Sequence, residues 1–573
     1  MGAVKGIPYG MSNFTDVIEQ NRYYVDKTMY IPMLEDQANY LIFTRPRRFG
    51  KSLLLSMLRA YYDLSSKDKF QQLFGNLWIG QQPTPLQGTY QMLYLDFSKI
   101  GGNIDELPQR FDSYSAVQLD GFLNRYRDYY TDEFISRFSA AEKGIDKLHI
   151  LDAEARRLGY PLYLIIDEYD NFTNIVLNEQ GNKIYHDITH ASGFYRDAFK
   201  NYKGMFDRIF MIGVSPVTLD DLTSGFNIGW NISTNPLFNQ MLGFSEEDVR
   251  TMFHYYQETG QLDGNIEEMI QEMKPWYDNY CFAEESLERD LNIFNCVMVL
   301  YYLRNRMQLG ISPEQMVDPN TRTDYSKMKK LIQLDRLDGD RKGVLRRIVE
   351  EGQILTELFN SFSADQITKP EIFPSLLFYY GMLTIIGKRG DRTLLGIPNN
   401  NVRKQYYEYL LEEYQSKNEI NFNHLKDLYD DMAFDGRWQP ALEFIAKAYK
   451  ENSSVRSNIE GERNIQGFLT AYLSINSYYL TAPEIELSHG FCDMFLMPDL
   501  QRYPEVNHSY ILELKYLPKD KFKMQAAEQW EEAINQIHRY TADSKVRQLC
   551  QHTQLHCIVM QFCGWELTRI EEV

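Results

Sequence analysis

Two short polar segments, each following an apolar run, carry the residue types that phosphate and magnesium chemistry needs. The first is Gly50-Lys51-Ser52, which follows the β-branched and aromatic run 40–44 and precedes an apolar helical pattern. Between a strand and a helix this tripeptide predicts a phosphate-binding loop, because a helix N-terminus offers unpaired N–H groups and a positive dipole end. We expect Lys51 to reach the β- and γ-phosphates of a nucleotide and the Ser52 hydroxyl to contact Mg²⁺.

The second segment is Asp167-Glu168, which ends the continuous apolar run 162–166. Such a run is typical of a strand buried on both faces of a parallel sheet, and ligands bind at the carboxyl ends of such strands. We expect Asp167 to hold the Mg²⁺, directly or through water. We expect Glu168 to orient and deprotonate the attacking water.

The runs 92–97 and 208–214 have the composition of further strands of the same sheet. Ser215 follows the second run, so a polar side chain at this position can contact the γ-phosphate. The sequence thus predicts an α/β domain with a parallel sheet.

The loop before Lys51 departs from the usual pattern, because Arg45 stands where a phosphate-binding loop has its first glycine. The letters RPRRFGKS at 45–52, together with LIIDEYDNF and FMIGVSPV further along, resemble the AAA-ATPase-like family found in many anaerobic bacteria. The resemblance implies a P-loop ATPase fold that binds ATP and Mg²⁺, with Arg45 as a family trait. Arg47 and Arg48 can contact phosphates or act across the subunit interface of a homo-oligomer. The implied nucleotide-binding residues are Arg45, Arg47, Arg48, Gly50, Lys51, Ser52 and Asp167.

Two other segments match the same family. The segment YYVDKT at 23–28 is one, although packing and capping of the first helix explain it equally well. The other is WYDNYCF at 276–282, which resembles the family's WYDGY turn, with Asn279 in place of glycine. Asn tolerates the left-handed backbone that such a turn needs.

The chain between the two chemical regions is rich in helix patterns. Ser245-Glu246-Glu247 predicts a capped helix start, and further helices are predicted at 266–273 and 293–306. A helix followed by a hairpin over 368–401 suggests a winged-helix-like element, which can bind DNA but more often packs within an ATPase lid.

A second group of charged residues lies near the C-terminus. Glu462 sits in a predicted helix, Asp493 in a predicted strand, and Glu513 and Lys515 in the next strand. Alternation places Glu513 and Lys515 on one face of their strand. Two carboxylates can bind Mg²⁺ through oxygen while a lysine orients water or stabilises phosphate charge, which is the chemistry of phosphodiester hydrolysis.

The order E…D…ExK…Q, with Gln536 as the last member, resembles the PD-(D/E)XK nuclease superfamily and in particular the nuclease domain often fused to this ATPase family. The resemblance implies catalytic roles for Glu462, Asp493, Glu513, Lys515 and Gln536, with Asp493 and Glu513 as the metal ligands. The family often has Gly-Arg-x-Asp before the first strand carboxylate, whereas this chain reads Gly-Phe-Cys-Asp at 490–493, so one phosphate contact is missing. A nuclease-like fold retained for binding or packing is the alternative.

Bulk properties limit the class of protein. The chain has 573 residues, which exceeds what one core supports, and its net charge of −19 argues against general coating of nucleic acid. Six cysteines show no paired framework, and no apolar run approaches the roughly 18–20 residues of a membrane span, so we expect a cytoplasmic protein with no membrane partner. The crowding of Cys550, His552, His556 and Cys557 suggests zinc, but the spacing misses common zinc patterns and 555–562 predicts a final strand.

The predicted organisation is a P-loop AAA-ATPase-like domain at 1–245, a helical lid with the winged-helix-like element at 246–401, a helical connector at 402–454 and a restriction-endonuclease-like α/β domain at 455–573. The predicted function is ATP hydrolysis coupled to Mg²⁺-dependent cleavage of nucleic acid, DNA in particular. By analogy the setting is defence against mobile DNA or a mobile element. Two alternatives remain: a nucleotide-gated switch whose nuclease-like domain only binds nucleic acid or protein, and an ATPase that acts on a protein partner.

Overall fold

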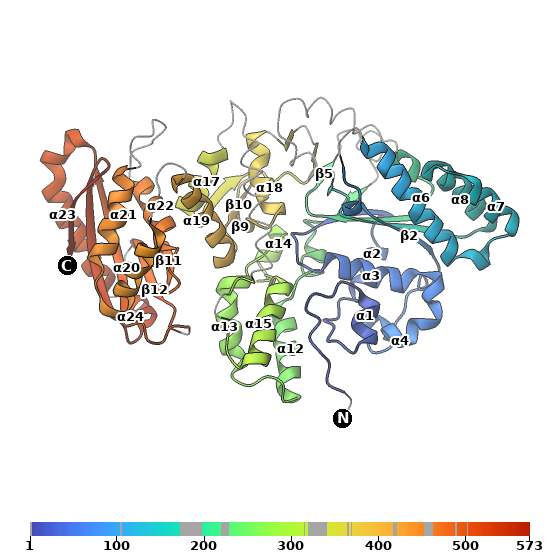
Figure 1. Ribbon diagram of the computed structural model, residues 1–573, viewed down its shortest axis with the longest axis horizontal. Helices are drawn as coiled ribbons and strands as arrows, with labels where there is room; N and C mark the ends of the chain where they lie inside the picture. Colours follow the sequence, from blue (N-terminus) through green and yellow to red (C-terminus); the bar gives the residue numbers. More distant parts are fainter. Residues whose placement is uncertain are drawn as a thin grey trace. The chain divides into compact units, whose positions relative to one another are not determined.

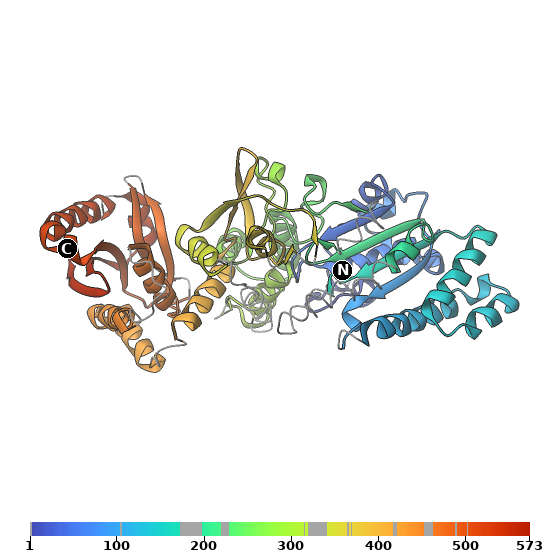
Figure 2. The same cartoon turned by 90° about the horizontal axis from the view of Figure 1, so that it is seen from above.

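The computed structural model of the chain describes residues 3–102, 106–171, 198–218, 229–313, 316–318, 341–363, 366–367, 369–415, 421–451, 462–487, 490–500, 502–541 and 543–573. The chain forms two compact units (Figures 1 and 2). Unit 1 comprises Met1–Arg341 and Leu355–Asn400, and unit 2 comprises Lys342–Ile354 and Asn401–Val573. The predicted domain boundary at residue 455 lies outside the described residues.

The centre of unit 1 is a five-stranded sheet in the order β2-β3-β4-β1-β6, in which all paired neighbours are parallel. Its strands are β1 (Tyr40–Thr44), β2 (Gln91–Asp96), β3 (Leu162–Asp167), β4 (Arg208–Gly213) and β6 (Trp230–Asn231). Every residue of β3 is buried, as the apolar run predicted. The α/β fold with a parallel sheet is therefore confirmed, and β4 separates β1 from β3.

Several α-helices of this region come before β3 in the chain. They are α1 (Phe14–Glu19), α2 (Tyr30–Glu35), α3 (Lys51–Tyr62), α4 (Phe70–Phe74), α5 (Trp78–Gln81), α6 (Leu107–Arg125), α7 (Asp132–Ala140) and α8 (Gly144–Leu158). Helix α6 packs on β2 and on α8, and α8 packs on α7, which gives the teal helical group of Figure 1.

The YYVDKT segment caps α5. The Asp26 carboxylate accepts the backbone N–H of Trp78 at 2.6 Å, and the Thr28 hydroxyl accepts that of Ile79 at 3.1 Å. These contacts satisfy N–H groups that a helix start leaves unpaired. The segment therefore packs on the first helix, as the sequence allowed, because Tyr24 contacts Phe14 of α1 with ring centres 5.0 Å apart, but the helix that it caps is α5.

The helices after the sheet are α12 (Glu246–Glu258), α13 (Ile266–Tyr277), α14 (Glu284–Leu287) and α15 (Cys296–Leu309). Ser245 and Asp248 form the capping box that starts α12. Helices α12, α13 and α15 share one apolar core that includes Phe253, Ile270 and Val299.

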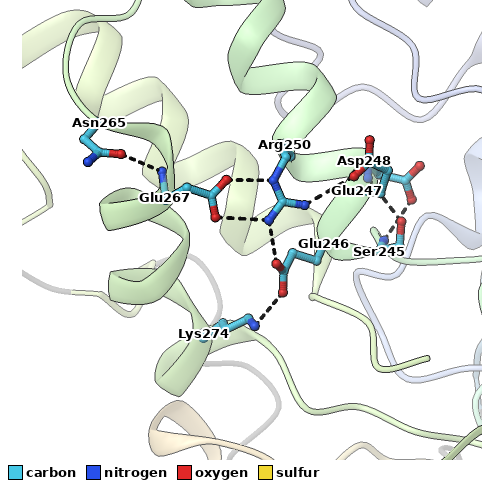
Figure 3. Close-up of polar contacts among 8 residues, drawn as sticks. All are labelled: Ser245, Glu246, Glu247, Asp248, Arg250, Asn265, Glu267 and Lys274. Carbon is cyan, nitrogen blue, oxygen red and sulfur yellow. Dashed lines mark hydrogen bonds and ion pairs between the residues drawn. The ribbon is translucent and has the colours of Figure 1, made fainter. Parts of the chain in front are cut away.

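An ion-pair network joins the polar sides of α12 and α13 (Figure 3). Arg250 contacts Glu246 and Glu247 on its own helix and Glu267 at the start of α13, at 2.7, 3.2 and 2.7 Å. Lys274 on α13 contacts Glu246 at 2.5 Å. The network therefore crosses between the two helices at two points.

The end of unit 1 contains the predicted helix followed by a hairpin. The elements are α18 (Phe373–Tyr379), β9 (Thr384–Arg389) and β10 (Arg392–Gly396), with β9 and β10 antiparallel. Upstream in unit 1, β8 (Phe362–Ser363) pairs with β5 (Val217–Thr218). Helix α17 (Arg341–Glu351) belongs to unit 2 apart from its first residue, and β7 (Gln353–Thr356) spans the boundary at residues 354 and 355.

Unit 2 is built on a mixed five-stranded sheet in the order β11-β12-β13-β14-β15. Its strands are β11 (Tyr479–Leu487), β12 (Gly490–Pro498), β13 (His508–Leu517), β14 (Gln554–Cys563) and β15 (Glu566–Glu572), and its helices are α19 (Asn400–Gln415), α20 (Phe422–Asp435), α21 (Gln439–Glu451), α22 (Glu462–Leu473), α23 (Lys519–Thr541) and α24 (Ser544–Cys550). Only β13 and β14 pair in parallel; the other neighbours are antiparallel.

The sheet of unit 2 separates two apolar cores. Leu512 and Leu514 of β13 join α20, α21 and α22 on one face, whereas Ile511 joins Trp530 and Ile537 of α23 on the other. The sequence placed 402–454 in a separate connector, but α20 and α21 share the core of the C-terminal sheet. The apolar faces of α20 and α21 are buried against that sheet. This long-range packing cannot be predicted from the local sequence.

The histidine and cysteine cluster of unit 2 has structural contacts. His556 Nε2 lies 2.9 Å from Nδ1 of His508, and its Nδ1 lies 2.7 Å from the Glu572 carboxylate. Cys550 and Cys557 are buried in the core with α23. These contacts agree with the sequence argument against zinc.

No helix within the described ranges is long and apolar enough to cross a membrane.

The Arg250 network generates a stability prediction. Arg250→Met keeps the aliphatic stem but removes contacts to three carboxylates, so we expect a loss of about 1 kcal/mol, seen as a fall of a few degrees in the Tm of unit 1. Glu247→Gln is the matched control, because the Glu247 side chain is 78% exposed and its loss should matter little. Equal Tm values for both variants would show that the network adds no stability.

Candidate nucleotide-binding and nuclease sites

The phosphate-binding loop of unit 1 connects β1 to the first turn of α3. Its backbone is left-handed at Arg48, with φ 69°, and at Gly50, with φ 93°, the residue just before the helix. The Lys51 ammonium is buried and donates to the carbonyl oxygens of Arg45 and Pro46, at 3.2 Å each. The loop carbonyls therefore hold this ammonium at the start of α3, the end of the helix at which the sequence predicts phosphate binding.

The predicted magnesium ligands meet at the carboxyl edge of the sheet. Ser52 Oγ donates to Asp167 Oδ2 at 3.0 Å, although the two residues are 115 positions apart. Burial raises the pKa of the Asp167 carboxyl, and the neighbouring Glu168 raises it further. A hydroxyl and a buried carboxylate are the oxygen donors that Mg²⁺ prefers, so these residues fit the ion.

Tyr94 belongs to the same corner and was missed by the sequence analysis. Its hydroxyl donates to Asp167 Oδ2 at 3.2 Å, and the Arg59 guanidinium lies 4.3 Å from the centre of its ring. The sequence did place Tyr94 in the predicted strand at 92–97. It did not show that this strand, β2, lies next to β3, and that pairing is what brings Tyr94 to Asp167.

The predicted base, Glu168, has a strained backbone. Its φ is 51°, in the left-handed region that residues other than glycine rarely adopt, and its N–H donates to Asp167 Oδ1 at 2.9 Å. Strain of this kind concentrates at functional sites. The observation motivates a functional role for Glu168, and the choice of base stays a prediction.

Asp170 connects this corner to the end of β4. Its carboxylate accepts the N–H groups of Val214, at 3.2 Å, and Ser215, at 2.8 Å. Ser215 is fully buried, and its hydroxyl has no hydrogen-bond partner within the described residues. The structure thus fixes Ser215 beside the end of β3.

The arginines of the loop differ in environment. Arg45 is 1% exposed, and its guanidinium donates to the backbone carbonyls of Thr44, Ser233 and Phe238. This geometry corrects the expectation that the Arg45 side chain binds nucleotide, because its donors are directed at the protein interior. Arg47 and Arg48 are partly exposed.

In unit 2 the predicted nuclease residues come together at the sheet. Lys515 Nζ lies 2.7 Å from Glu513 Oε1, and Asp493 Oδ2 accepts the N–H of Leu514 at 2.7 Å. Gln466 of α22 donates to the Asp493 carbonyl at 2.7 Å, which fixes the helix that begins at Glu462 against β12.

The ionisable side chains of this cluster shift one another's pKa values. The pKa of Asp493 is raised to about 6 and that of Glu513 to about 7; burial is the largest cause of both rises, and Asp493 is the second cause of the rise at Glu513. Glu462 raises both pKa values, whereas Lys515 lowers them. Burial lowers the pKa of Lys515, but Glu513 and Asp493 outweigh it and raise that pKa overall. These four residues therefore act on one another, as their predicted roles require.

One carboxylate oxygen of the cluster is free to bind a divalent cation. Glu513 Oε2 is buried and has no hydrogen-bond partner within the described residues. No three acidic, histidine or cysteine side chains of the described ranges form a complete metal cage. Mg²⁺ often uses one or two carboxylates and takes its other ligands from water and substrate phosphate. Asp493 and Glu513 therefore fit such an ion.

Helix α23 brings a further polar group to the cluster. Burial and then Glu513 raise the pKa of the Tyr540 phenol, so Tyr540 lies close to the carboxylates. Gln536 is one helical turn earlier, and its Oε1 is buried without a partner within the described residues. The structure therefore places Tyr540 at the cluster, while the catalytic role of Gln536 stays a prediction.

The first site generates a paired prediction. We expect Lys51→Ala to abolish ATP hydrolysis and weaken ATP binding while the fold survives, because the change removes the ammonium at the start of α3. We expect Glu168→Gln to bind ATP but to hydrolyse it about 10²–10⁴-fold more slowly, which is the usual cost of removing a general base. Nucleotide titration and phosphate release measure the two effects. Full turnover by Glu168→Gln, with none by Asp167→Asn, would show that the base lies elsewhere.

The second site generates a prediction about metal and pH. The folded-state pKa of Glu513, about 7, exceeds its ordinary 4.5, so without metal the native state loses stability as the pH rises from about 4.5 through 7. Millimolar Mn²⁺ or Mg²⁺ should raise the Tm of unit 2 at pH 8 and raise it less at pH 5.5, where a proton occupies the carboxylates. Thermal denaturation measures both.

In the same experiment Glu513→Gln should lose the metal-dependent shift, and Glu531→Gln, an exposed site on α23, should keep it. An equal metal shift in the two variants would contradict metal binding at this cluster.

Comparison with known proteins supports two assignments within the chain. Residues 8–223 match the family described as a predicted AAA-ATPase, and residues 460–572 match the PD-(D/E)XK nuclease superfamily. An uncharacterized protein in the vnfD 5'region of Azotobacter chroococcum mcd 1 is 24% identical over 293 residues, which cover 49% of this chain and 50% of that protein. The chain therefore spans about half the length of this relative.

One solved structure similar to the chain is the Aeropyrum pernix ORC1 protein in complex with DNA. It covers 68% of this chain and 92% of its own, with a TM-score of 0.25 and 10% sequence identity. The family matches agree with the motifs and with the two sheets. The chain thus carries a predicted AAA-ATPase domain at residues 8–223 and a PD-(D/E)XK nuclease superfamily domain at residues 460–572.

Proposed function

We propose that this protein hydrolyses ATP in unit 1 and cleaves nucleic acid, DNA in particular, in unit 2, with Mg²⁺ at both sites. The observation that carries the proposal is the convergence of Glu462, Asp493, Glu513 and Lys515 in one partly buried cluster, where the buried Glu513 Oε2 lacks a partner among the described residues. Charged groups are rarely buried together unless a site needs them. From the two domains we infer a bacterial cytoplasmic setting, in defence against mobile DNA or within a mobile element.

In the ATPase site each residue has a separate task. Lys51 binds the β- and γ-phosphates, and the N–H groups at the start of α3 bind phosphate oxygens. Ser52 and Asp167 hold the cation, which neutralises the charge that develops on the phosphates. Glu168 accepts a proton from the attacking water.

In the nuclease site Asp493 and Glu513 would hold the cation, which when bound would lower the pKa of water and polarise the phosphate. Lys515, held 2.7 Å from Glu513, orients the water or stabilises the negative charge on the phosphodiester. Glu462 would add a further carboxylate to the site or hold a water at the cation. Because the chain is acidic, with a net charge of −19, cleavage should depend strongly on the ion.

One observation favours a second candidate, in which the nuclease-like domain only binds nucleic acid or protein and ATP acts as the switch. At the position where the superfamily resemblance expects an arginine the chain has Phe491, followed by the buried Cys492. One phosphate contact is therefore missing. This candidate predicts ATP-dependent retention of nucleic acid without cleavage.

The nuclease proposal generates its own prediction. Wild-type protein with Mg²⁺ or Mn²⁺ should cut plasmid or phage DNA, and Asp493→Ala, Glu513→Ala and Lys515→Ala should each reduce cleavage by at least about 10²-fold, because each removes a group that acts on the transition state. Gel analysis of the products, with and without ATP, measures this.

Mutants of the two sites, each assayed for both activities, separate the candidates. Glu513→Ala should leave ATP hydrolysis nearly unchanged, and Lys51→Ala should reduce cleavage if the ATP state gates the nuclease. Full cleavage by Lys51→Ala would show that the two activities are independent. Retention of DNA or RNA by wild type, with no cleavage under any metal, would favour the binding module.

A further inference from the structure

We propose that Arg45 is a positioning residue, whose buried guanidinium holds the phosphate-binding loop in the shape that binds ATP by fastening it to the segments 232–239 and 280–282. The inference rests on the proposed ATP-binding function of the loop. It gives a role to the position at which this loop departs most from the usual pattern. A phosphate-binding loop usually has glycine where this chain has Arg45.

The guanidinium is held by carbonyl oxygens from separate parts of unit 1. Nη1 donates to the carbonyls of Thr44, at 2.9 Å, and Ser233, at 2.6 Å, while Nη2 donates to that of Phe238, at 2.9 Å. The backbone N–H of Arg45 donates to the Gly213 carbonyl at the end of β4, at 3.2 Å. Both the side chain and the backbone of this residue are therefore anchored.

Two aromatic rings enclose the guanidinium. The carbon Cζ of Arg45 lies 4.3 Å from the ring centre of Phe43, on β1, and 4.3 Å from that of Phe282. A desolvated cation between two aromatic faces is held by electrostatic attraction as well as by packing. Burial lowers the pKa of Arg45 to about 9, which still leaves the guanidinium charged at neutral pH.

The two anchoring segments are themselves joined. The side chain of Asn239, which is fully buried, accepts the N–H of Phe282 at 2.8 Å and donates to the Leu291 carbonyl at 2.7 Å. Arg45 is therefore attached to a connected frame.

The same WYDNYCF turn packs against the rest of the loop. Tyr280 and Phe282 approach the Phe49 ring edge-on, with ring centres 5.0 and 5.7 Å away. A Cβ at Gly381 would lie 2.8 Å from the Pro46 side chain, so the loop fits closely there. These contacts hold the side of the loop that packs against Tyr280, Phe282 and Gly381. The start of α3 is left for phosphate.

The anchor acts on the group that binds phosphate. Lys51 donates to the carbonyls of Arg45 and Pro46, so the backbone that Arg45 fixes is also the backbone on which the Lys51 ammonium rests. Without the anchor the loop should spend only part of its time in the binding shape. A fall of that population to about a tenth raises the apparent Kd about tenfold and leaves the chemistry of bound ATP nearly unchanged.

The test uses the full chain and measures ATP affinity, KM and kcat, with Tm as a check on folding. Arg45→Met keeps much of the length and apolar contact but removes the charge and every donor. Arg45→Lys keeps the charge without the planar fork that reaches three carbonyls. Arg110→Met is the matched control, because Arg110 is an exposed arginine paired with Glu106 on α6.

We expect Arg45→Met to raise the Kd and KM for ATP about tenfold or more while kcat falls less than about threefold. Arg45→Lys should be intermediate, and Arg110→Met should match wild type. Wild-type KM in a folded Arg45→Met, or loss of kcat at unchanged KM, would overturn the role of Arg45. No ATP binding by wild type would instead overturn the proposed function itself.

If Arg45→Met does not fold, Phe282→Leu decides the question. This change removes one aromatic face and leaves the guanidinium and its carbonyl partners in place. A raised KM with kcat retained supports the anchor, and an unchanged KM overturns it.

Discussion

The hydrogen bond from Ser52 to Asp167 is the contact on which the proposed ATP site of unit 1 depends. It joins the first turn of α3, the helix that follows β1, to the end of β3, and β4 separates β1 from β3 in the sheet. Only a sheet in which β1, β4 and β3 run in parallel brings both carboxyl ends to one edge. Asp170, which binds the end of β4, keeps that edge in register. The site is therefore a consequence of strand order.

In unit 2, burial disfavours the charged form of the carboxylates that the sequence assigned to the nuclease site. The sheet of this unit brings Asp493 and Glu513 together in a buried place, although burial and mutual repulsion raise both pKa values. Lys515 offsets part of that cost. The cluster therefore costs stability in the metal-free protein, and the proposed cation would offset more of that cost.

The sequence predicted the features that depend on local pattern. The strand at 162–166 and the residues Lys51 and Asp167 could be identified because phosphate-binding loops and buried strands leave short signatures. Alternation in β13 likewise placed Glu513 and Lys515 on one face, which agrees with Leu512 and Leu514 in the opposite core. The family matches at 8–223 and 460–572 confirm the two domain types.

Features that depend on tertiary contacts could not be predicted. The direction of Arg45 follows from Phe282 and the carbonyls of 233 and 238, which are far away in sequence. Tyr94 reaches Asp167 only because β2 lies next to β3. No local signal reveals such neighbours, and for the same reason the sequence assigned α20 and α21 to a separate connector.

The most direct test of this account is a crystal structure with Mg²⁺ and a non-hydrolysable ATP analogue. It should show the cation at Ser52 and Asp167 and the Lys51 ammonium moved from the loop carbonyls to the phosphates. The Arg45 guanidinium should stay between Phe43 and Phe282. Phosphates bound away from the start of α3, or an Arg45 side chain turned out to contact them, would contradict the account.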